Sequence, residues 1–185
     1  MHDIRERHHS LSIDHTPKWH RRTLAAEEGA FTLTTKPIVR DVLRSEYNSW
    51  LPLWDGYNAF YGRHGDTALP EQITASTWRR LLDPEEPVHA LVAEIGGELV
   101  GLTHFVFHRS LIRIENVCYL SDLYAAPRNR GNGIGRALIE GVCERAHSSG
   151  VSRVYWQTHE GNLASRRLYD LVARHEGFLV YSRER

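Results

Sequence analysis

The sequence predicts a mixed α/β (α+β) protein with a central mixed sheet, whose N-terminal strands are antiparallel and whose flanks carry helices. Three short apolar runs with strand character follow one another between residues 88 and 126. A helix, strand, helix and strand are expected after them, and a strand–helix–strand unit places its two strands side by side in parallel. The chain of 185 residues is long enough for one domain with a sizeable core.

The N-terminal segment differs in composition from the rest. Residues 1–28 hold five of the twelve histidines, interspersed with arginine and lysine. This spacing could suggest a metal site, but a polar, poorly ordered extension is the favoured interpretation. The single domain is expected to span residues 29–185, and its first strand to be residues 31–35 (FTLTT), which alternate between apolar and polar residues.

Two helices are expected next. Residues 37–63 are interpreted as mainly helical because aromatic residues recur at spacings of three and four from Tyr47 onward. Pro52 lies inside this segment and is expected to kink or divide the helix. Residues 71–82 form a shorter amphipathic pattern.

The middle of the chain predicts an antiparallel meander. Residues 88–95 and 98–108 are two strand-like runs separated by Gly96-Gly97, which is a hairpin signal. After a loop, residues 117–126 are apolar on both faces, as is typical of a central strand.

The C-terminal part alternates helices and strands. A helix is predicted over residues 133–150, a strand over 151–158, and a second helix over 162–175 with Asn162 as its N-cap. Residues 178–183 (FLVYSR) are predicted to form the last strand.

Composition excludes several classes of protein. Lys plus Arg equal Asp plus Glu at 23 each, which argues against nucleic acid as the main partner. Two cysteines are too few for a disulfide framework, so a reduced, cytoplasmic setting is expected. No apolar run approaches the length of a membrane span, and we expect neither a membrane partner nor a signal peptide.

Residues 130–137 (RGNGIGRA) carry the main chemical signal. Three glycines alternate between two arginines where a strand gives way to a helix. A helix start offers unpaired N–H groups and positive potential, and glycines let an anion approach them, so a phosphate or pyrophosphate site is predicted. The dinucleotide-binding and Walker spacings both fail, because each requires glycine where this chain has Arg136.

The pattern Arg130-x-x-Gly133-x-Gly135 at this junction resembles the acetyl-CoA loop of the GNAT superfamily of N-acetyltransferases. The resemblance extends over about residues 31–185 and includes a second motif. In the family, an Asn after the next strand is followed seven residues later by a Tyr, as Asn162 and Tyr169 are here. The surrounding segments look most like the branch that holds diamine and polyamine acetyltransferases and the yeast enzymes for histone tails, polyamines and D-amino acids.

The resemblance implies acetyl-CoA as cosubstrate and no metal. It also implies that the strand before the glycine loop splays from its parallel neighbour, so that backbone groups of the former can pair with the pantetheine arm. The helix start and the resemblance together predict the residues that bind the cofactor. These are Leu123, Tyr124, Ala125, Arg130, Gly131, Asn132, Gly133, Ile134, Gly135, Arg136, Asn162 and Tyr169.

Acetyl transfer needs a proton donor for the leaving thiolate and a route for the proton of the amine. The resemblance assigns the donor role to Tyr169, while its helix position also fits a core tyrosine. The base stays open, because Ser121 stands where diamine acetyltransferases carry a glutamate. Asp122 is a catalytic candidate or a buried structural acceptor on the strand face opposite Ser121; His104, His108 and a chain of water molecules are the alternatives.

The acceptor site is expected beside the first helix pair. The stripe of Trp50, Trp54, Tyr57 and Tyr61 is either core or an aromatic wall for an ammonium group. We take Trp54, Tyr57 and His108 as substrate candidates. The predicted function is acetylation of a primary amine, most simply a polyamine or amino acid, by a cytoplasmic enzyme. The alternatives are a protein or peptide amine as acceptor, or a non-catalytic acetyl-CoA-binding module. The resemblance further implies a homodimer.

Overall fold

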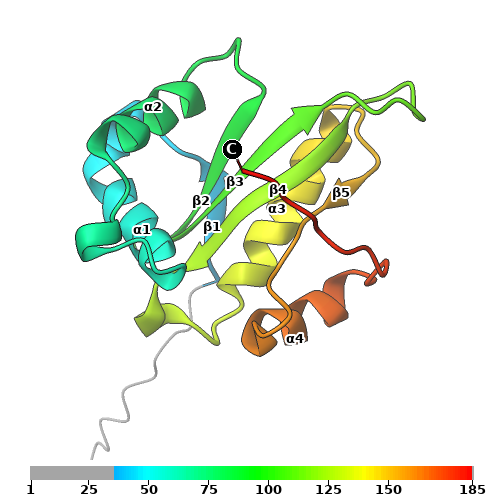
Figure 1. Ribbon diagram of the computed structural model, residues 1–185. Coiled ribbons are helices and arrows are strands. Elements are labelled where there is room, and N and C mark those ends of the chain that lie inside the picture. Colours follow the sequence, from blue (N-terminus) through cyan, green and yellow to red (C-terminus); the bar gives the residue numbers. More distant parts are fainter. Residues whose placement is uncertain (1–35, 185) are drawn as a thin grey trace, which may run out of the picture. The chain divides into compact units, whose positions relative to one another are not determined.

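The computed structural model describes residues 36–184, so the predicted extension at 1–28 and the predicted strand at 31–35 lie outside the described residues. The described chain forms one five-stranded sheet, in the order β1-β2-β3-β4-β5, with helices on both faces (Figure 1). The strands are β1 (Ile38–Asp41), β2 (Val88–Ile95), β3 (Glu98–His108), β4 (Val117–Ala125) and β5 (Val154–Tyr155). The helices are α1 (Tyr47–Phe60), α2 (Glu71–Leu81), α3 (Ile134–Ser148) and α4 (Leu163–Val172).

The sheet topology confirms the predicted meander and parallel pair. Strands β1 to β4 pair antiparallel with their neighbours, and β5 pairs parallel with β4 after the crossover through α3. The hairpin between β2 and β3 turns at Gly96 and Gly97, whose φ angles of 60° and 83° are readily adopted only by glycine. The mixed α/β class is therefore correct.

Two apolar clusters hold the helices to opposite faces of the sheet. On one face, α3 packs Leu138 and Val142 against Phe105 of β3. On the other face, α1 packs Trp50 and Trp54 against strands β2 and β3. All five side chains are buried. In the described part of the chain, no helix combines the length and apolar character that crossing a bilayer requires.

The predicted long helix at 37–63 is wrong at its start. Residues 38–41 instead form β1, which pairs with residues 91–94 of β2, and α1 begins only at Tyr47. The Arg40 guanidinium holds β1 in place by bonding Glu94 of β2 and Glu46 at the start of α1, each at 2.6 Å. This pairing across the sheet outweighs the local helical pattern.

Pro52 does not divide α1, which runs without interruption from Tyr47 to Phe60. A proline removes one backbone donor and frees the carbonyl four residues earlier. Pro52 lies on the exposed side of the helix, where water can satisfy that carbonyl.

The C-terminal strands are shorter than predicted. The strand expected at 151–158 is reduced to the two residues of β5, and residues 178–183 form no strand. Their apolar side chains, from Phe178 to Tyr181, are 63–89% exposed. An alternating pattern makes a strand only where a neighbouring strand offers its backbone groups, and none pairs with this segment in the described chain.

Candidate active site

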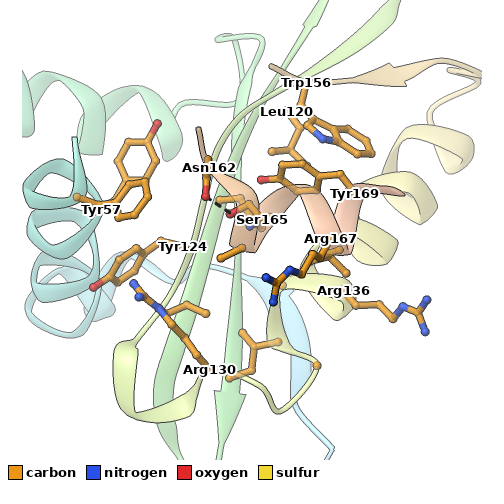
Figure 2. Close-up of a pocket in the computed structure, with 18 of the residues that line it drawn as sticks. Tyr57, Leu120, Tyr124, Arg130, Arg136, Trp156, Asn162, Ser165, Arg167 and Tyr169 are labelled. Carbon is orange, nitrogen blue, oxygen red and sulfur yellow. Dashed lines mark hydrogen bonds between the residues drawn. The ribbon is translucent and has the colours of Figure 1, made fainter. Parts of the chain in front are cut away.

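A cavity of about 610 Å³ opens where β4 and β5 part (Figure 2). The two strands pair only at Cys118↔Val154 and Tyr119↔Tyr155, so the edge of β4 from Leu120 onward has no strand beside it. Side chains of α1, β4, the loop before α3, and α4 line the space. A strand edge left open in this way presents backbone donors and acceptors to a ligand.

The floor of the cavity is the start of α3. Its N-cap is Gly133, which no side-chain hydrogen bond supplements, so the first amides of the helix keep their capacity to bind an anion. Gly131 and Gly133 have φ angles of 82° and 77°, and a Cβ at either position would meet no atom within 4 Å. The backbone conformation therefore requires glycine here, and the absence of side chains leaves the amides open to approach.

Cationic side chains flank this helix start. Arg130 donates from Nε to the Ala125 carbonyl at 3.2 Å, and its guanidinium lies 5.7 Å from the centre of the Tyr124 ring. The guanidinium of Arg167, on α4, points toward the same space (Figure 2). Arg136 also lines the cavity, but its Nε lies 3.8 Å from a glutamate one turn further along α3, and the side chain extends outward.

Helix α4 positions the tyrosine at the far wall. The Asn162 side chain accepts a hydrogen bond from the Ser165 amide and donates to Thr158, and this N-cap fixes where the helix begins. Tyr169, two turns along, packs edge-on against Trp156 at 5.4 Å between ring centres. Burial raises the pKa of Tyr169, with a smaller opposing effect from Ser165, so its hydroxyl stays protonated at neutral pH.

A β-bulge sets the orientation of Asp122. Across the β3–β4 pair, His104 lies opposite Asp122 while Phe105 lies opposite Leu120, so Ser121 is an extra residue in β4. The inserted residue shifts the alternation of side chains between the two faces of the sheet, and the Asp122 side chain lies on the α1 face beside His104. The prediction from the sequence assumed that side chains alternate strictly along β4, so it did not include this shift.

Two hydrogen bonds hold the Asp122 carboxylate in place. His104 is 5% exposed, and its Nε2 accepts from the Trp50 indole N–H at 3.1 Å. An indole nitrogen can only donate, so the imidazole proton must reside on Nδ1. That nitrogen lies 2.9 Å from Asp122 Oδ2 and donates to it. The Ser121 hydroxyl lies 3.4 Å from the other carboxylate oxygen.

Two tyrosines of α1 and the turn after it connect this carboxylate to the cavity. Tyr57 and Tyr61 both line the cavity, and their rings meet edge-to-face at 5.1 Å. Burial and, next in size, the Asp122 carboxylate raise the pKa of both hydroxyls. Asp122 itself does not line the cavity, but Ser121 does, and its hydroxyl lies 3.4 Å from the Asp122 carboxylate.

The cavity brings together most of the predicted cofactor residues. Those that line it are Leu123, Tyr124, Ala125, Arg130, Gly131, Gly133, Ile134, Gly135, Arg136, Asn162 and Tyr169. Asn132 does not line it. Of the substrate candidates, Tyr57 lines it, whereas Trp54 is a core residue bonded to Thr74. His108 does not line the cavity. It is the last residue of β3, and its side chain bonds the Tyr155 hydroxyl at 2.9 Å.

Several lining residues were not predicted from the sequence. Ser165, Arg167 and Trp156 all face the cavity. The helical period offered a signal for one of them, because Ser165 is four residues before Tyr169 on α4 and therefore shares its face. Among residues 36–184, no three His, Cys, Asp or Glu side chains are grouped to hold a metal ion.

Comparison with known proteins finds a family match and similar acetyltransferases. The model of the Acetyltransferase (GNAT) family matches residues 47–172. The yeast Saccharomyces cerevisiae D-amino-acid N-acetyltransferase HPA3 is 30% identical over 162 residues, which cover 86% of this chain and 98% of the yeast protein. The mouse thialysine N-epsilon-acetyltransferase is 35% identical over 92 residues, which cover 45% of this chain and 54% of the mouse protein.

Solved structures share the fold. The aminoglycoside N-acetyltransferase AAC(6')-Iy, in complex with a bisubstrate analogue that contains CoA, superimposes with a TM-score of 0.69. The match covers 80% of this chain and 98% of that one, at 16% sequence identity. The ribosomal-protein-alanine N-acetyltransferase of Brucella melitensis gives a TM-score of 0.64 at 20% identity, with 80% and 98% covered.

Proposed function

The chain belongs to the Acetyltransferase (GNAT) family, and on that premise we propose that it transfers the acetyl group of acetyl-CoA to the primary amine of a small molecule, an amino acid or a polyamine. The names of its relatives support a small acceptor, since the yeast relative is a D-amino-acid N-acetyltransferase and the mouse relative a thialysine N-epsilon-acetyltransferase. A cavity of about 610 Å³ is of the size that small ligands occupy.

The residues of the cavity fit acetyl-CoA. The cosubstrate carries a pyrophosphate, for which the uncapped start of α3 and the guanidinium groups of Arg130 and Arg167 are suitable partners. Its pantetheine arm contains amides, for which the open edge of β4 beyond Leu120 provides backbone partners. When bound, acetyl-CoA supplies the thioester that is the acyl donor.

Two side chains of the chain itself are proposed to move protons. A lysine-like amine has a pKa near 10.4, so at pH 7 only about one molecule in a thousand is neutral and nucleophilic. Asp122, held by His104, is suited to attract the ammonium group and to take its proton, through the Tyr57 hydroxyl or a water molecule. Tyr169 is suited to donate its proton, or a hydrogen bond, to the departing sulfur.

The observation that carries the proposal is the continuity of the open β4 edge with the uncapped, glycine-lined helix start in one cavity. The test measures thiol release from acetyl-CoA over a panel of amino acids, polyamines, aminoglycosides and lysine peptides. Turnover with a small amine supports the proposal. Turnover with peptides alone indicates a protein acetyltransferase, and binding without turnover indicates a non-catalytic module.

A second measurement tests the cofactor site. Gly133→Asp adds a carboxylate at the proposed pyrophosphate site and should abolish acetyl-CoA binding in a calorimetric titration. Gly150→Asp is the matched control, because Gly150 also has a positive φ, of 73°, with no atom within 4 Å of a Cβ, but follows the other end of α3. Equal affinity in the two folded variants would contradict the assignment.

We further propose that the enzyme is a cytoplasmic homodimer and that residues 1–28 are dispensable for catalysis. Family resemblance supports the dimer, and the low cysteine content supports a reducing compartment. Light scattering that gives a single species of about 21 kDa at micromolar concentration would exclude the dimer. A chain that begins near residue 30 should keep its full rate of thiol release, and a folded but inactive truncation would assign a role to the extension.

A further inference from the structure

Arg63, to which the proposed mechanism assigns no role, does not itself line the cavity but contacts two tyrosines that do. Its Nε donates to the Asn58 side chain at 2.8 Å, which fixes the base of the guanidinium. The guanidinium lies 5.8 Å from the ring centre of Tyr57 and 5.4 Å from that of Tyr61. Within residues 36–184, its two terminal nitrogens have no hydrogen-bond or ion-pair partner. The fork of the guanidinium is therefore oriented but uncommitted.

The Asp122 carboxylate lies next to the same cavity, because Ser121, whose hydroxyl is 3.4 Å from it, lines the cavity together with both tyrosines. Asp122 raises the pKa of Tyr57 and of Tyr61, whereas Arg63 acts on both in the opposite direction. Both rings line the cavity. A fixed anion and a fixed cation thus influence the same pair of phenols, and a ligand that contacts these phenols experiences both charges.

This charge arrangement selects among small amines. A polyamine carries two or more positive charges, and an arginine without an acidic partner repels the second one. An amino acid carries an amine together with a carboxylate, which is the planar anion that a guanidinium fork binds best. Of the two acceptor classes that the proposed function leaves open, the pair of charges favours the amino acid.

We propose that Arg63 binds the carboxylate of an amino-acid acceptor whose amine is directed toward Asp122. This inference rests on the proposed acetyltransferase function and adds the specificity determinant of the acceptor. The competing explanation is that Arg63 only packs on the two tyrosine rings and stabilises the end of α1. That explanation predicts no dependence on the acceptor.

The experiment compares acceptors that differ only in the carboxylate, namely alanine of either configuration against ethylamine, and lysine against cadaverine. Steady-state thiol release gives kcat/KM for each. The wild-type enzyme should favour the carboxylate-bearing member of at least one pair by about 10-fold or more, the range expected for a charged hydrogen bond.

Variants at Arg63 assign the preference. Arg63→Met keeps the apolar stem and removes the charge, and should raise KM for the amino acid about 10- to 100-fold while changing that for the amine without a carboxylate by less than about threefold. Arg63→Lys should recover part of the preference, because it keeps the charge without the fork. Arg79→Met is the matched control, because Arg79 lies on α2 and hydrogen-bonds Ser76 of the same helix, whereas Arg63 contacts two tyrosines of the cavity lining.

The outcomes separate the inference from the function on which it rests. If wild-type enzyme uses both members of every pair equally, or if Arg63→Met impairs them equally, the carboxylate site is refuted and the acetyltransferase function stands. If no amine of any class supports thiol release, the proposed function fails, and the inference fails with it. Should Arg63→Met not fold, the wild-type acceptor pairs and Arg63→Lys decide the question.

Discussion

Replacing Tyr169 by Phe removes one hydroxyl from the cavity and leaves the wall otherwise intact. The ring packs edge-on against Trp156 at 5.4 Å, and phenylalanine can keep that contact. Burial raises the pKa of Tyr169, so the lost group is a protonated donor at neutral pH. If the hydroxyl donates to the departing sulfur, the variant should slow the chemical step without weakening cosubstrate binding.

The size of the effect follows from the charge that forms on the sulfur. A hydrogen bond to a charged group is worth about 1.5–3 kcal/mol, which corresponds to a decrease in kcat of about 10- to 150-fold. The dissociation constant for acetyl-CoA should change by less than about threefold, because the thioester sulfur is neutral in the ground state. Loss of the hydroxyl should change the free energy of unfolding by less than about 1 kcal/mol, or about 4 °C in Tm.

Three measurements on one variant test this reasoning: thiol-release kinetics, a titration with acetyl-CoA, and a thermal melt. Tyr155→Phe is the control, since the Tyr155 hydroxyl bonds His108 outside the cavity lining. A kcat within threefold of wild type, accompanied by a lower Tm, would refute the donor role and identify Tyr169 as a packing residue. A large loss of acetyl-CoA affinity would instead assign the hydroxyl to ground-state binding.

Three further changes have defined outcomes. Gly56→Ala places a Cβ 2.3 Å from the Tyr124 hydroxyl, so the Tyr124 ring, which lines the cavity, must shift. The free energy of unfolding should fall by about 1–3 kcal/mol, as measured by a thermal melt. Acetyl-CoA binding should weaken, as measured by titration. His104→Ala removes the partner of the Trp50 indole N–H and of Asp122 Oδ2 and should lower the free energy of unfolding by about 3 kcal/mol in urea titrations. The hydrogen bond from Arg40 lowers the pKa of Glu46 below its ordinary value of 4.5. The stability that this pair contributes is therefore present above about pH 4.5, and it is lost as the pH falls through the lowered pKa of Glu46 in the folded protein. In Arg40→Met, the free energy of unfolding should depend less on pH in this acidic range.

Local chemistry made much of this molecule predictable. Gly96 and Gly97 predict the β2–β3 turn because few other residues adopt their φ angles. Asn162 predicts the start of α4, because a capping side chain must lie within three residues of the amide that it accepts from. The glycine loop before α3 was also predictable from its local sequence, and most of its residues line one cavity.

Non-local partners account for what could not be predicted. Residues 38–41 form a strand because β2 and two glutamates lie beside them, and residues 178–183 form none because no strand pairs with them in the described chain. The position of Arg63 over two tyrosine rings depends on how the chain leaves α1. None of these arrangements is contained in the spacing of residues along the sequence.

Because Ser121 is an extra residue, the even-numbered residues of β4 face α3 before it and the odd-numbered residues face α3 after it. Odd and even positions exchange faces at this point, so that a carboxylate reaches the α1 side of the sheet while Leu123 stays with the apolar cluster under α3. Substituting Ser121 preserves that exchange, whatever side chain is introduced. Deleting it while the pairing with β3 is kept would restore regular alternation, with Asp122 still opposite His104 and Leu123 still opposite Thr103. The site should therefore tolerate many replacements at this position, and a deletion there should change the bend of β4 rather than the faces on which Asp122 and Leu123 lie.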